Sequence, residues 1–328
     1  MSFAAIVGHR KQLEILRQAL QHGRLHHAYL FVGEEGVGKK TIALGFAKAL
    51  HCLGATGDFC DECANCARVQ DRNHPDVRII EPAAGKKEIS IQQIRELEKE
   101  LNFRSFSGKN KVVILDPATS MNLAAQNALL KTLEEPPQDS LLILIASNGG
   151  ALLPTLRSRC HRVTFTPLAR ELIRDFLVSR KALETETAEF LAAISLGRLS
   201  AVVGIDPQKL FDKRRDWLRL VSNLAARDYR AAIDAAEVLA GSKENCLTFL
   251  EWVESWFRDL LIYGVTRSVE DVINIDMLPQ IQKQSPAIAL ERIFGQIAEV
   301  KAAVEGIQRN LNRRMTMENL LLDMVETG

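Results

Sequence analysis

Hydrophobic residues in the first half of the chain form short continuous runs that are separated by longer stretches with helical spacing. The runs are Ala28–Val32, Val77–Ile80, Val112–Leu115, Leu141–Ala146 and Arg162–Phe165. Each has the length of a buried strand, and Pro, Asp or Gly follows most of them. Buried strands that alternate with helices are typical of a parallel sheet with helices on both faces. The pattern therefore predicts an α/β domain.

The stretches between these runs predict helices. Residues 1 to about 25 contain an amphipathic pattern that includes Leu13 and Leu16, and residues 41–50 and 89–97 repeat apolar residues at helical spacing. Ser90 is a candidate N-cap for the helix over 89–97. A further helix is predicted to open at Ser120 and to stop before Pro136.

Pro167 marks a change, because only helical patterns follow it. Helices are predicted over about 169–180 and 183–195, and a longer set covers about 207–326. We expect three parts: a sheet domain over 1–166, a small helical domain over 167–205, and an all-α domain over 206–328.

Composition narrows the class of protein. The 328 residues contain 42 Lys and Arg against 41 Asp and Glu, so there is no global basic field of the kind that attracts nucleic acid. The apolar run Leu141–Ala146 is too short to span a bilayer, and the N-terminus lacks the pattern of a signal peptide. We expect a cytoplasmic protein with no membrane partner, in which the six cysteines are thiols or metal ligands rather than disulfides.

The stretch Gly33–Thr41 nearly matches the phosphate-binding P-loop pattern of Gly, four residues, Gly-Lys and then Ser or Thr. It lies between a predicted strand and a predicted helix, as the pattern requires. The misfit is Lys40, because an ammonium cannot replace the hydroxyl that ligates Mg²⁺. Thr41 is no simple substitute, since one step along a helix turns the side chain by about 100°. A Gly-rich turn needed only for packing is the alternative interpretation.

A P-loop ATPase also needs a carboxylate at the end of another buried strand, and Asp116 has that position. The next residue is Pro117, where a Glu would activate the attacking water, and proline offers no side-chain base. Asp116 could also simply begin a turn before proline. With two catalytic parts missing, we do not expect this chain to hydrolyse ATP by itself.

Four cysteines within fifteen positions predict a metal site. Tetrahedral Zn²⁺ takes four such ligands and favours short Cys-x-x-Cys spacings, and four sulfurs leave no open position for substrate. We therefore expect a structural zinc module over 52–66, with disulfides or separate core thiols as the alternative. The predicted ligands are Cys52, Cys60, Cys63 and Cys66.

Ser158-Arg159-Cys160 precedes the last predicted strand of the sheet domain. Arg159 is either an ordinary surface cation or an arginine finger that reaches a γ-phosphate bound by a neighbouring subunit. From the residues alone, an ordinary surface cation is the favoured interpretation of Arg159.

Several stretches of the chain carry a family resemblance: 27–31, the four-cysteine module, His74-Pro75-Asp76, 126–137, 153–160 and the closing helix over 312–322. The combination of Leu-Glu-Glu-Pro-Pro with Ser-Arg-Cys is the most specific among them. Together these stretches resemble the bacterial DNA polymerase III clamp-loader subunits, closely over residues 5 to 205 and more loosely beyond.

Within that family the chain is most similar to the delta-prime branch. The gamma/tau motor branch would have an intact Gly-Lys-Thr and an Asp-Glu pair, where this chain has Gly38-Lys39-Lys40 and Asp116-Pro117. The resemblance implies an AAA+ P-loop domain, a small helical lid, and a helical collar that assembles a five-subunit ring. It also implies that Arg159 acts on ATP in the adjacent gamma/tau subunit.

The resemblance places Ser147 at the family's sensor-1 position and Arg198 near its sensor-2 position, although the residues around Arg198 depart from the family pattern. A helix-capping or solvated arginine is the alternative for Arg198. The candidate residues of the degenerate nucleotide site are thus Gly33, Gly36, Gly38, Lys39, Thr41, Asp116, Ser147 and Arg198.

The resulting hypothesis is a delta-prime-like subunit that helps ATP-dependent loading of a sliding clamp onto primed DNA. Its expected partners are the gamma/tau and delta subunits, and through the assembled complex the sliding clamp and primer–template DNA. Its expected cofactor is structural Zn²⁺, while binding of ATP and Mg²⁺ by this chain stays open. The alternatives are an ATP-hydrolysing gamma/tau-like motor, a stand-alone P-loop kinase, and a zinc-bearing interaction protein with no nucleotide role.

Overall fold

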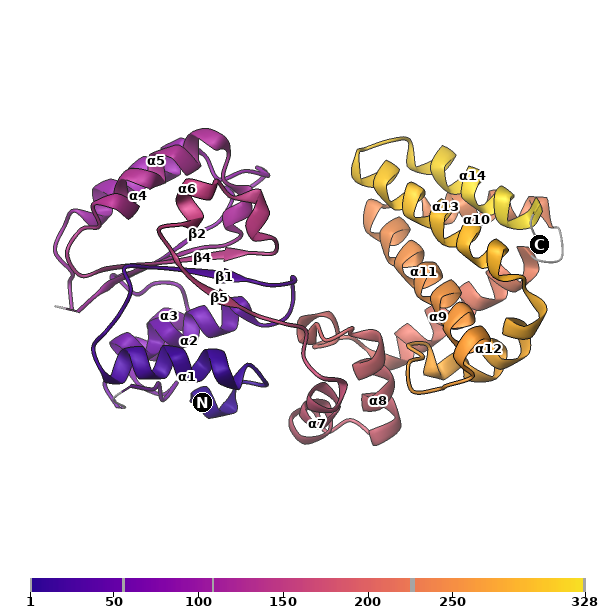
Figure 1. Cartoon of the computed structure of the whole chain (residues 1–328), viewed down its shortest axis with the longest axis horizontal. Helices are drawn as coiled ribbons and strands as arrows, with labels where there is room; N and C mark the ends of the chain where they lie inside the picture. Colours follow the sequence, from indigo (N-terminus) through magenta and orange to yellow (C-terminus); the bar gives the residue numbers. More distant parts are fainter. Residues whose placement is uncertain (1, 55–56, 108, 225–227, 327–328) are drawn as a thin grey trace. The chain divides into compact units, whose positions relative to one another are not determined.

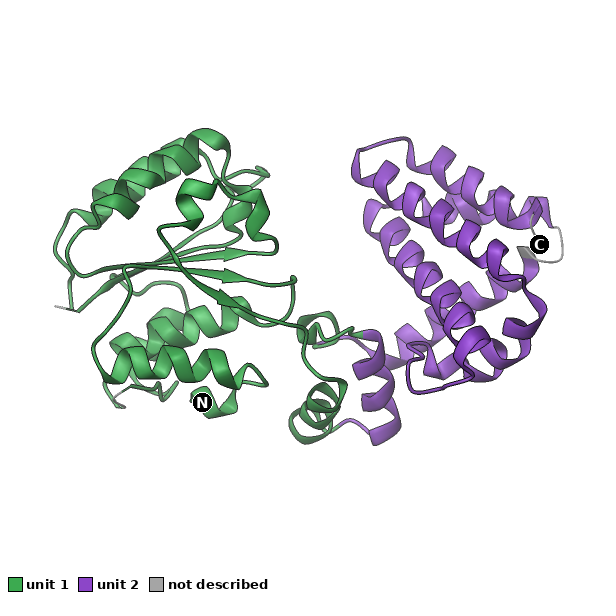
Figure 2. Ribbon diagram, viewed as in Figure 1, with its two compact units in different colours: residues 1–182, 195–203 green, residues 183–194, 204–328 purple. Residues whose placement is uncertain are grey.

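The computed structural model describes residues 2–54, 57–107, 109–224 and 228–326, which divide into two compact units (Figure 2). The first unit contains residues 1–182 and 195–203, and the second contains residues 183–194 and 204–328. The residues of the predicted small helical domain, 167–205, are thus shared between the two units. The three-part division of the chain stays a prediction.

The first unit is built on a five-stranded parallel sheet with the order β2-β3-β4-β1-β5. Its strands are β1 (Ala28–Val32), β2 (Val77–Ile80), β3 (Lys111–Leu115), β4 (Ser140–Ala146) and β5 (His161–Thr164). All five lie at the predicted runs, within one or two residues. The most buried strands are the three central ones, β1, β3 and β4, which explains why their sequences are continuous apolar runs rather than alternating ones.

Helices cover both faces of this sheet (Figure 1). On one face lie α1 (Arg10–Gln21), α2 (Lys39–His51) and α3 (Ala64–Gln70), and on the other lie α4 (Ile91–Leu101), α5 (Leu123–Glu134) and α6 (Pro154–Arg157). The unit also contains α7 (Arg170–Lys181) and short 3₁₀ helices at Phe3–Ala5, Ala118–Ser120, Gly149–Ala151 and Leu199–Ala201.

Alternate residues of the three central strands enter one of two hydrophobic cores, because successive side chains of a strand point to opposite faces. On β1, for example, Tyr29 and Phe31 belong to the core on the α2 side, and Leu30 and Val32 belong to the core on the α5 side. The predicted fold class, a parallel α/β domain followed by helices, is confirmed.

The N-terminal ends of α4 and α5 test the predicted helix starts. Ser90 caps α4 as predicted: its hydroxyl accepts a hydrogen bond from the Gln93 N–H at 3.4 Å, and the Gln93 side chain bonds back to the cap. The predicted start of the next helix at Ser120 is wrong, because Ser120 ends a 3₁₀ turn and Asn122 caps α5 instead.

The second unit contains helices only, among the residues that the structure describes. They are α8 (Thr185–Ile194), α9 (Pro207–Leu224), α10 (Tyr229–Leu239), α11 (Lys243–Thr266), α12 (Leu278–Gln284), α13 (Leu290–Gln308) and α14 (Arg313–Glu326), with 3₁₀ turns at Ile275–Met277 and Ser285–Ala287. One hydrophobic core joins most of them, and all three tryptophans of the chain, Trp217, Trp252 and Trp256, belong to it. In the described part of the chain, no helix has both the length and the apolar surface needed to cross a membrane.

A buried polar network crosses this helical core. The Arg214 guanidinium on α9 donates two hydrogen bonds to the Asp276 carboxylate, at 2.9 and 2.8 Å, and a third to Asn274 Oδ1 at 2.6 Å. The Asp259 carboxylate on α11 in turn accepts hydrogen bonds from the backbone N–H groups of Ile273 and Asn274. These bonds fix the turn at 271–277 between two helices, where an unpaired charge would be costly.

We expect Arg214→Ala to destabilise the second unit by about 3 kcal/mol, because it leaves the Asp276 carboxylate, which has a side-chain exposure of 10%, without its cation. Urea unfolding followed by tryptophan fluorescence measures this unit alone, since every tryptophan lies in it. The neighbouring Arg215→Ala is the control: Arg215 is exposed and pairs with exposed Asp212, so we expect a change within about 0.5 kcal/mol. Equal losses for the two variants would contradict the role given to the network.

Candidate functional site

The P-loop-like turn lies at the carboxyl end of β1 and leads directly into α2, in the strand–loop–helix arrangement that the sequence predicts. Two of its glycines are required by close packing. A Cβ on Gly33 would lie 2.3 Å from the Phe165 carbonyl oxygen, and a Cβ on Gly36 would lie 2.5 Å from the Ser200 Oγ. Gly36 and Gly38 also have left-handed backbone angles, with φ of 85° and 105°. The shape of the loop therefore depends on these glycines whether or not a nucleotide binds.

Lys39, the lysine of the P-loop pattern, is turned back onto its own loop. Its Nζ donates hydrogen bonds to the carbonyl oxygens of Gly33 at 2.5 Å and Glu34 at 2.6 Å, and the residue is 6% exposed. Burial lowers the pKa of Lys39, although the nearby carboxylates of Asp116, Glu35 and Glu34 act in the opposite direction. In this arrangement two of the three ammonium protons are donated to carbonyl oxygens of the loop itself.

Lys40 points to the ends of the neighbouring strands. Its ammonium contacts the Glu81 carboxylate and lies 3.0 Å from Asp116 Oδ2. Burial alone would lower the pKa of Lys40, but the hydrogen bonds to these two carboxylates raise it above its usual value. The same bond from Lys40 lowers the pKa of Glu81, which also accepts a bond of 2.8 Å from Arg72. Lys40 and Glu81 are therefore both charged at neutral pH.

Glu81 is a residue of this site that the sequence analysis missed. It follows β2 directly, as Asp116 follows β3, and the two strands are paired in register through Ile80 and Leu115. The sequence contained the signal, an acidic residue directly after a predicted strand, because polar residues after neighbouring parallel strands meet at the carboxyl edge of a sheet. The order of the strands was needed to know that the two carboxylates are adjacent.

The other predicted nucleotide residues lie around the same edge. Ser147 follows β4 and is exposed; β4 lies between β1 and β3, so Ser147 is between the loop and Asp116 along the edge. The segment that contains Arg198 packs on the loop: Ser200 N–H donates to the Gly36 carbonyl at 3.2 Å, and the Arg198 Nε donates to the Ser195 carbonyl at 3.4 Å. Thr41 is exposed, one position beyond Lys40 on α2.

Arg159 lies just after α6 and before β5, with a side chain that is 36% exposed. Its guanidinium is held within the unit by two contacts: one nitrogen lies 2.7 Å from the Glu134 carboxylate at the end of α5, and the other donates to the Thr155 carbonyl at 2.8 Å. Glu134 belongs to the Leu-Glu-Glu-Pro-Pro stretch, and sequence reasoning did not connect it with Arg159.

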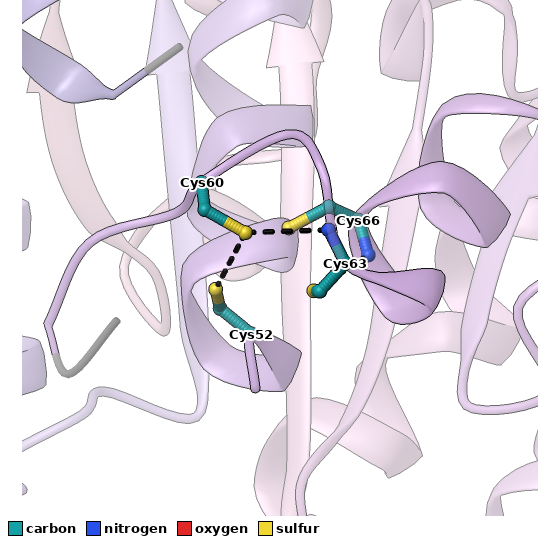
Figure 3. A group of neighbouring side chains, drawn as sticks. All are labelled: Cys52, Cys60, Cys63 and Cys66. Atoms are coloured by element: carbon teal, nitrogen blue, oxygen red, sulfur yellow. Dashed lines mark hydrogen bonds between the residues drawn. The ribbon is translucent and has the colours of Figure 1, made fainter. Parts of the chain in front are cut away.

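The four cysteines of the predicted zinc module come together at the C-terminal end of α2 and the start of α3 (Figure 3). All four sulfurs lie within 4.8 Å of one another, and the Cys52 and Cys60 sulfurs are 3.6 Å apart. Sulfurs at the corners of a zinc tetrahedron are about 3.8 Å apart, given Zn–S bonds of about 2.3 Å. The four thiols could therefore hold a metal ion, and their softness suits zinc.

Backbone N–H groups turn toward these sulfurs. The Cys63 N–H lies 3.4 Å from the Cys60 sulfur, and the Cys66 N–H lies 3.5 Å from the Cys63 sulfur. Hydrogen bonds from backbone N–H groups lower the pKa of Cys60, and they bring that of Cys63 to about 6. Burial instead raises the pKa of Cys66 to about 12.

The cysteine module is attached to the rest of the unit by several contacts. Lys48 on α2 pairs with Asp61 at 2.5 Å, and the Phe59 ring packs edge-on against Phe3 with centroids 5.2 Å apart. The Phe3 N–H donates to Asp58 at 2.9 Å. The module thus joins the N-terminal segment to α2 at the end of that helix farthest from the P-loop.

A buried polar cluster next to the module was also missed by the sequence analysis. The side chains of His51, His74 and Asp76 offer ligand atoms within 4.8 Å of one another. The Asp76 carboxylate already accepts three bonds, from the N–H groups of Phe106 and Ser107 and from the Ser107 hydroxyl, at 2.6 to 2.8 Å. Asp76 therefore anchors the loop before β3, which gives the Asp of the His-Pro-Asp motif a structural role.

Comparison with known proteins identifies the family. The profile described as "DNA polymerase III, delta subunit" matches residues 8–169, and the one described as "DNA polymerase III, delta subunit, C terminal" matches residues 208–326. The chain is 29% identical to the DNA polymerase III subunit delta' of Bacillus subtilis, over 96% of this chain and 95% of that protein. It is 31% identical to the delta' subunit of Pseudomonas aeruginosa, over 90% of each.

A tau/gamma subunit also matches. The chain is 39% identical to the DNA polymerase III subunit tau/gamma of Haemophilus influenzae, over 85% of this chain but 42% of that protein. Both the full-length matches and the two profiles agree with the resemblance stated from the motifs, and the chain belongs to the delta-prime family of DNA polymerase III clamp-loader subunits.

Proposed function

We propose that this chain is a non-hydrolysing subunit of a DNA polymerase III clamp loader, where it completes the ATP site of a neighbouring gamma/tau subunit with Arg159. In this proposal ATP binding by the neighbours drives closure of the assembly, opening of the sliding clamp and gripping of primer–template DNA. Hydrolysis then releases the clamp and the DNA.

The observation that carries the proposal is the position of the Lys40 ammonium between Glu81 and Asp116. A P-loop ATPase uses this space for Mg²⁺, which bridges the phosphates and is held by a hydroxyl and a carboxylate. Here the hydroxyl is absent and the carboxylate is neutralised by an internal cation. Pro117 offers no base for water at the next position, so two separate steps of hydrolysis lack their residues.

Arg159 suits action in trans for three reasons. It lies on the surface, it follows a short helix that holds its backbone, and its guanidinium has a partner that can be exchanged. An exposed ion pair such as Arg159–Glu134 contributes about 0–1 kcal/mol, so a phosphate from a neighbouring subunit would displace Glu134 at little cost.

The four-cysteine module supports a structural rather than catalytic metal. Four sulfurs fill the tetrahedral coordination of zinc and leave no position for a substrate. We propose that zinc stabilises the end of α2 and the N-terminal segment through the contacts of Lys48 and Phe59. The helical unit would serve as the collar that fixes the subunit among its gamma/tau and delta partners.

A gamma/tau-like ATPase is the second candidate, since the tau/gamma relative has the highest identity among the three compared. ATP turnover by the purified chain at the rates of an ordinary P-loop ATPase would favour it. The pairing of Lys40 with Asp116 argues against it, because the motor requires that carboxylate for Mg²⁺.

We expect Arg159→Ala to reduce the clamp-dependent ATPase of a complex reconstituted with gamma/tau and delta subunits. An arginine finger contributes roughly 10³-fold or more to turnover at the site it completes. We therefore expect that one site to lose hydrolysis, while the other sites keep theirs. Single-turnover hydrolysis in the assembled complex measures the loss as a missing fraction of the burst.

Two variants control this measurement. Arg162→Ala removes an exposed arginine only three positions away, and we expect no loss of ATPase. Glu134→Gln frees Arg159 from its own carboxylate, and we expect ATPase at or above that of the wild type. An Arg159→Ala complex with unchanged hydrolysis would overturn the finger and favour an interaction protein with no nucleotide role.

We expect protein purified without chelator to contain about one zinc ion per chain. Cys63→Ser should lose most of this zinc and should melt at a lower temperature, because the binding free energy of a structural zinc is folding free energy. Elemental analysis and thermal unfolding followed by circular dichroism provide the two readings. Cys160→Ser is the control, since Cys160 lies outside the cluster and should keep the metal. A folded wild-type sample free of metal would refute the zinc site.

A further inference from the structure

Three elements meet at one ammonium group. Lys40 is the second residue of α2, Glu81 follows β2, and Asp116 follows β3. The Asp116 N–H also donates to the Ile80 carbonyl at 3.0 Å, so the backbone holds the two carboxylates at neighbouring strand ends. The Lys40 side chain is 34% exposed and that of Asp116 is 19% exposed, which removes much of the surrounding water from the contact.

The charges of this group balance without a metal ion. Lys40 and Arg72 supply two positive charges, and Glu81 and Asp116 supply two negative charges. Lys40 contacts both carboxylates, and Arg72 contacts Glu81. Two adjacent carboxylates at this edge would otherwise repel each other or attract a divalent cation. A divalent ion that entered would face the Lys40 ammonium at contact distance, a repulsion that is large at the surface of a protein.

We propose that Lys40 is a tethered cation that replaces Mg²⁺ between Glu81 and Asp116, so that the P-loop of this chain excludes divalent ions. Lys40 and Glu81 are in this view the residues that decide metal specificity at the loop. The inference deepens the proposed function, which requires only that the loop does not hydrolyse ATP. It further states that any nucleotide bound here binds without a divalent ion, and that a single substitution creates a metal site.

The direct test is Mn²⁺ binding by the full chain, measured by the electron paramagnetic resonance signal of free Mn²⁺ in the presence of ADP. Mn²⁺ prefers carboxylate and phosphate oxygens, so the cysteine module does not compete for it. We expect the wild type to leave the signal at its value with ADP alone. Lys40→Thr, which restores the hydroxyl and frees both carboxylates, should bind about one Mn²⁺ per chain, at least about tenfold more tightly than the wild type.

Two further variants show whether the gained site is the one described. Adding Glu81→Gln to Lys40→Thr should weaken the new Mn²⁺ site, because one ligand charge is lost. Lys11→Thr is the matched control: Lys11 is also the second residue of a helix, α1, and is exposed, so its replacement should create no site. Thermal unfolding provides a second reading, since Mn²⁺ should raise the melting temperature of Lys40→Thr and leave that of the wild type unchanged.

Two results would overturn the proposal. Wild-type protein that binds Mn²⁺ as tightly as Lys40→Thr would mean that the ammonium does not exclude the ion. Folded Lys40→Thr with no gain in Mn²⁺ binding would mean that the carboxylates do not form a metal site. If Lys40→Thr does not fold, Lys40→Met, which also removes the ammonium, replaces it in both comparisons. Neither result affects the Arg159 measurement, so failure of this inference and failure of the trans-acting function are distinguishable.

Discussion

The ion pairs of Lys40 connect the P-loop helix to the ends of two neighbouring strands, so three elements of the first unit meet at one ammonium group. In a hydrolysing P-loop protein, a metal ion and its nucleotide bring the loop, the helix and the acidic strand end together. In this chain a covalently attached cation makes the same connections. In the proposed mechanism these side-chain contacts let the subunit keep its shape through a cycle in which its neighbours bind and release ATP.

The remaining features of the first unit fit a scaffold of this kind. Lys39 bonds to its own loop, the segment near Arg198 packs on Gly36, and the cysteine module fastens the far end of α2. The first two contacts fix the loop at the start of α2, and the third fixes the other end of that helix. Arg159 lies instead at the surface, with one exposed carboxylate as its partner. In the proposed mechanism the rigid part of the unit thus positions one exchangeable side chain for a neighbour.

Much of the fold and of the candidate site could be predicted from the sequence, because the patterns that indicate them are local. Continuous apolar runs gave the five strands, Ser90 gave a helix start, and the cysteine spacing gave the cluster. The pairing of Lys40 with Glu81 could not be predicted, since it depends on β2 and β3 being neighbours. The Arg159–Glu134 contact likewise joins two stretches that β4 separates in the sequence, so it depends on the tertiary fold. The start of α5 was misplaced because Ser120 and Asn122 are both good caps, and the 3₁₀ turn before the helix decides between them.

The central claim is that the chemistry served by this chain happens at a neighbour's nucleotide and not at its own loop. The most direct measurement is the clamp-dependent ATPase of a reconstituted complex in which this subunit carries either Lys39→Ala or Arg159→Ala. We expect Lys39→Ala to leave hydrolysis within about twofold of the wild type, because no essential nucleotide depends on that lysine, and Arg159→Ala to remove the contribution of one site. A large loss with Lys39→Ala and none with Arg159→Ala would contradict it.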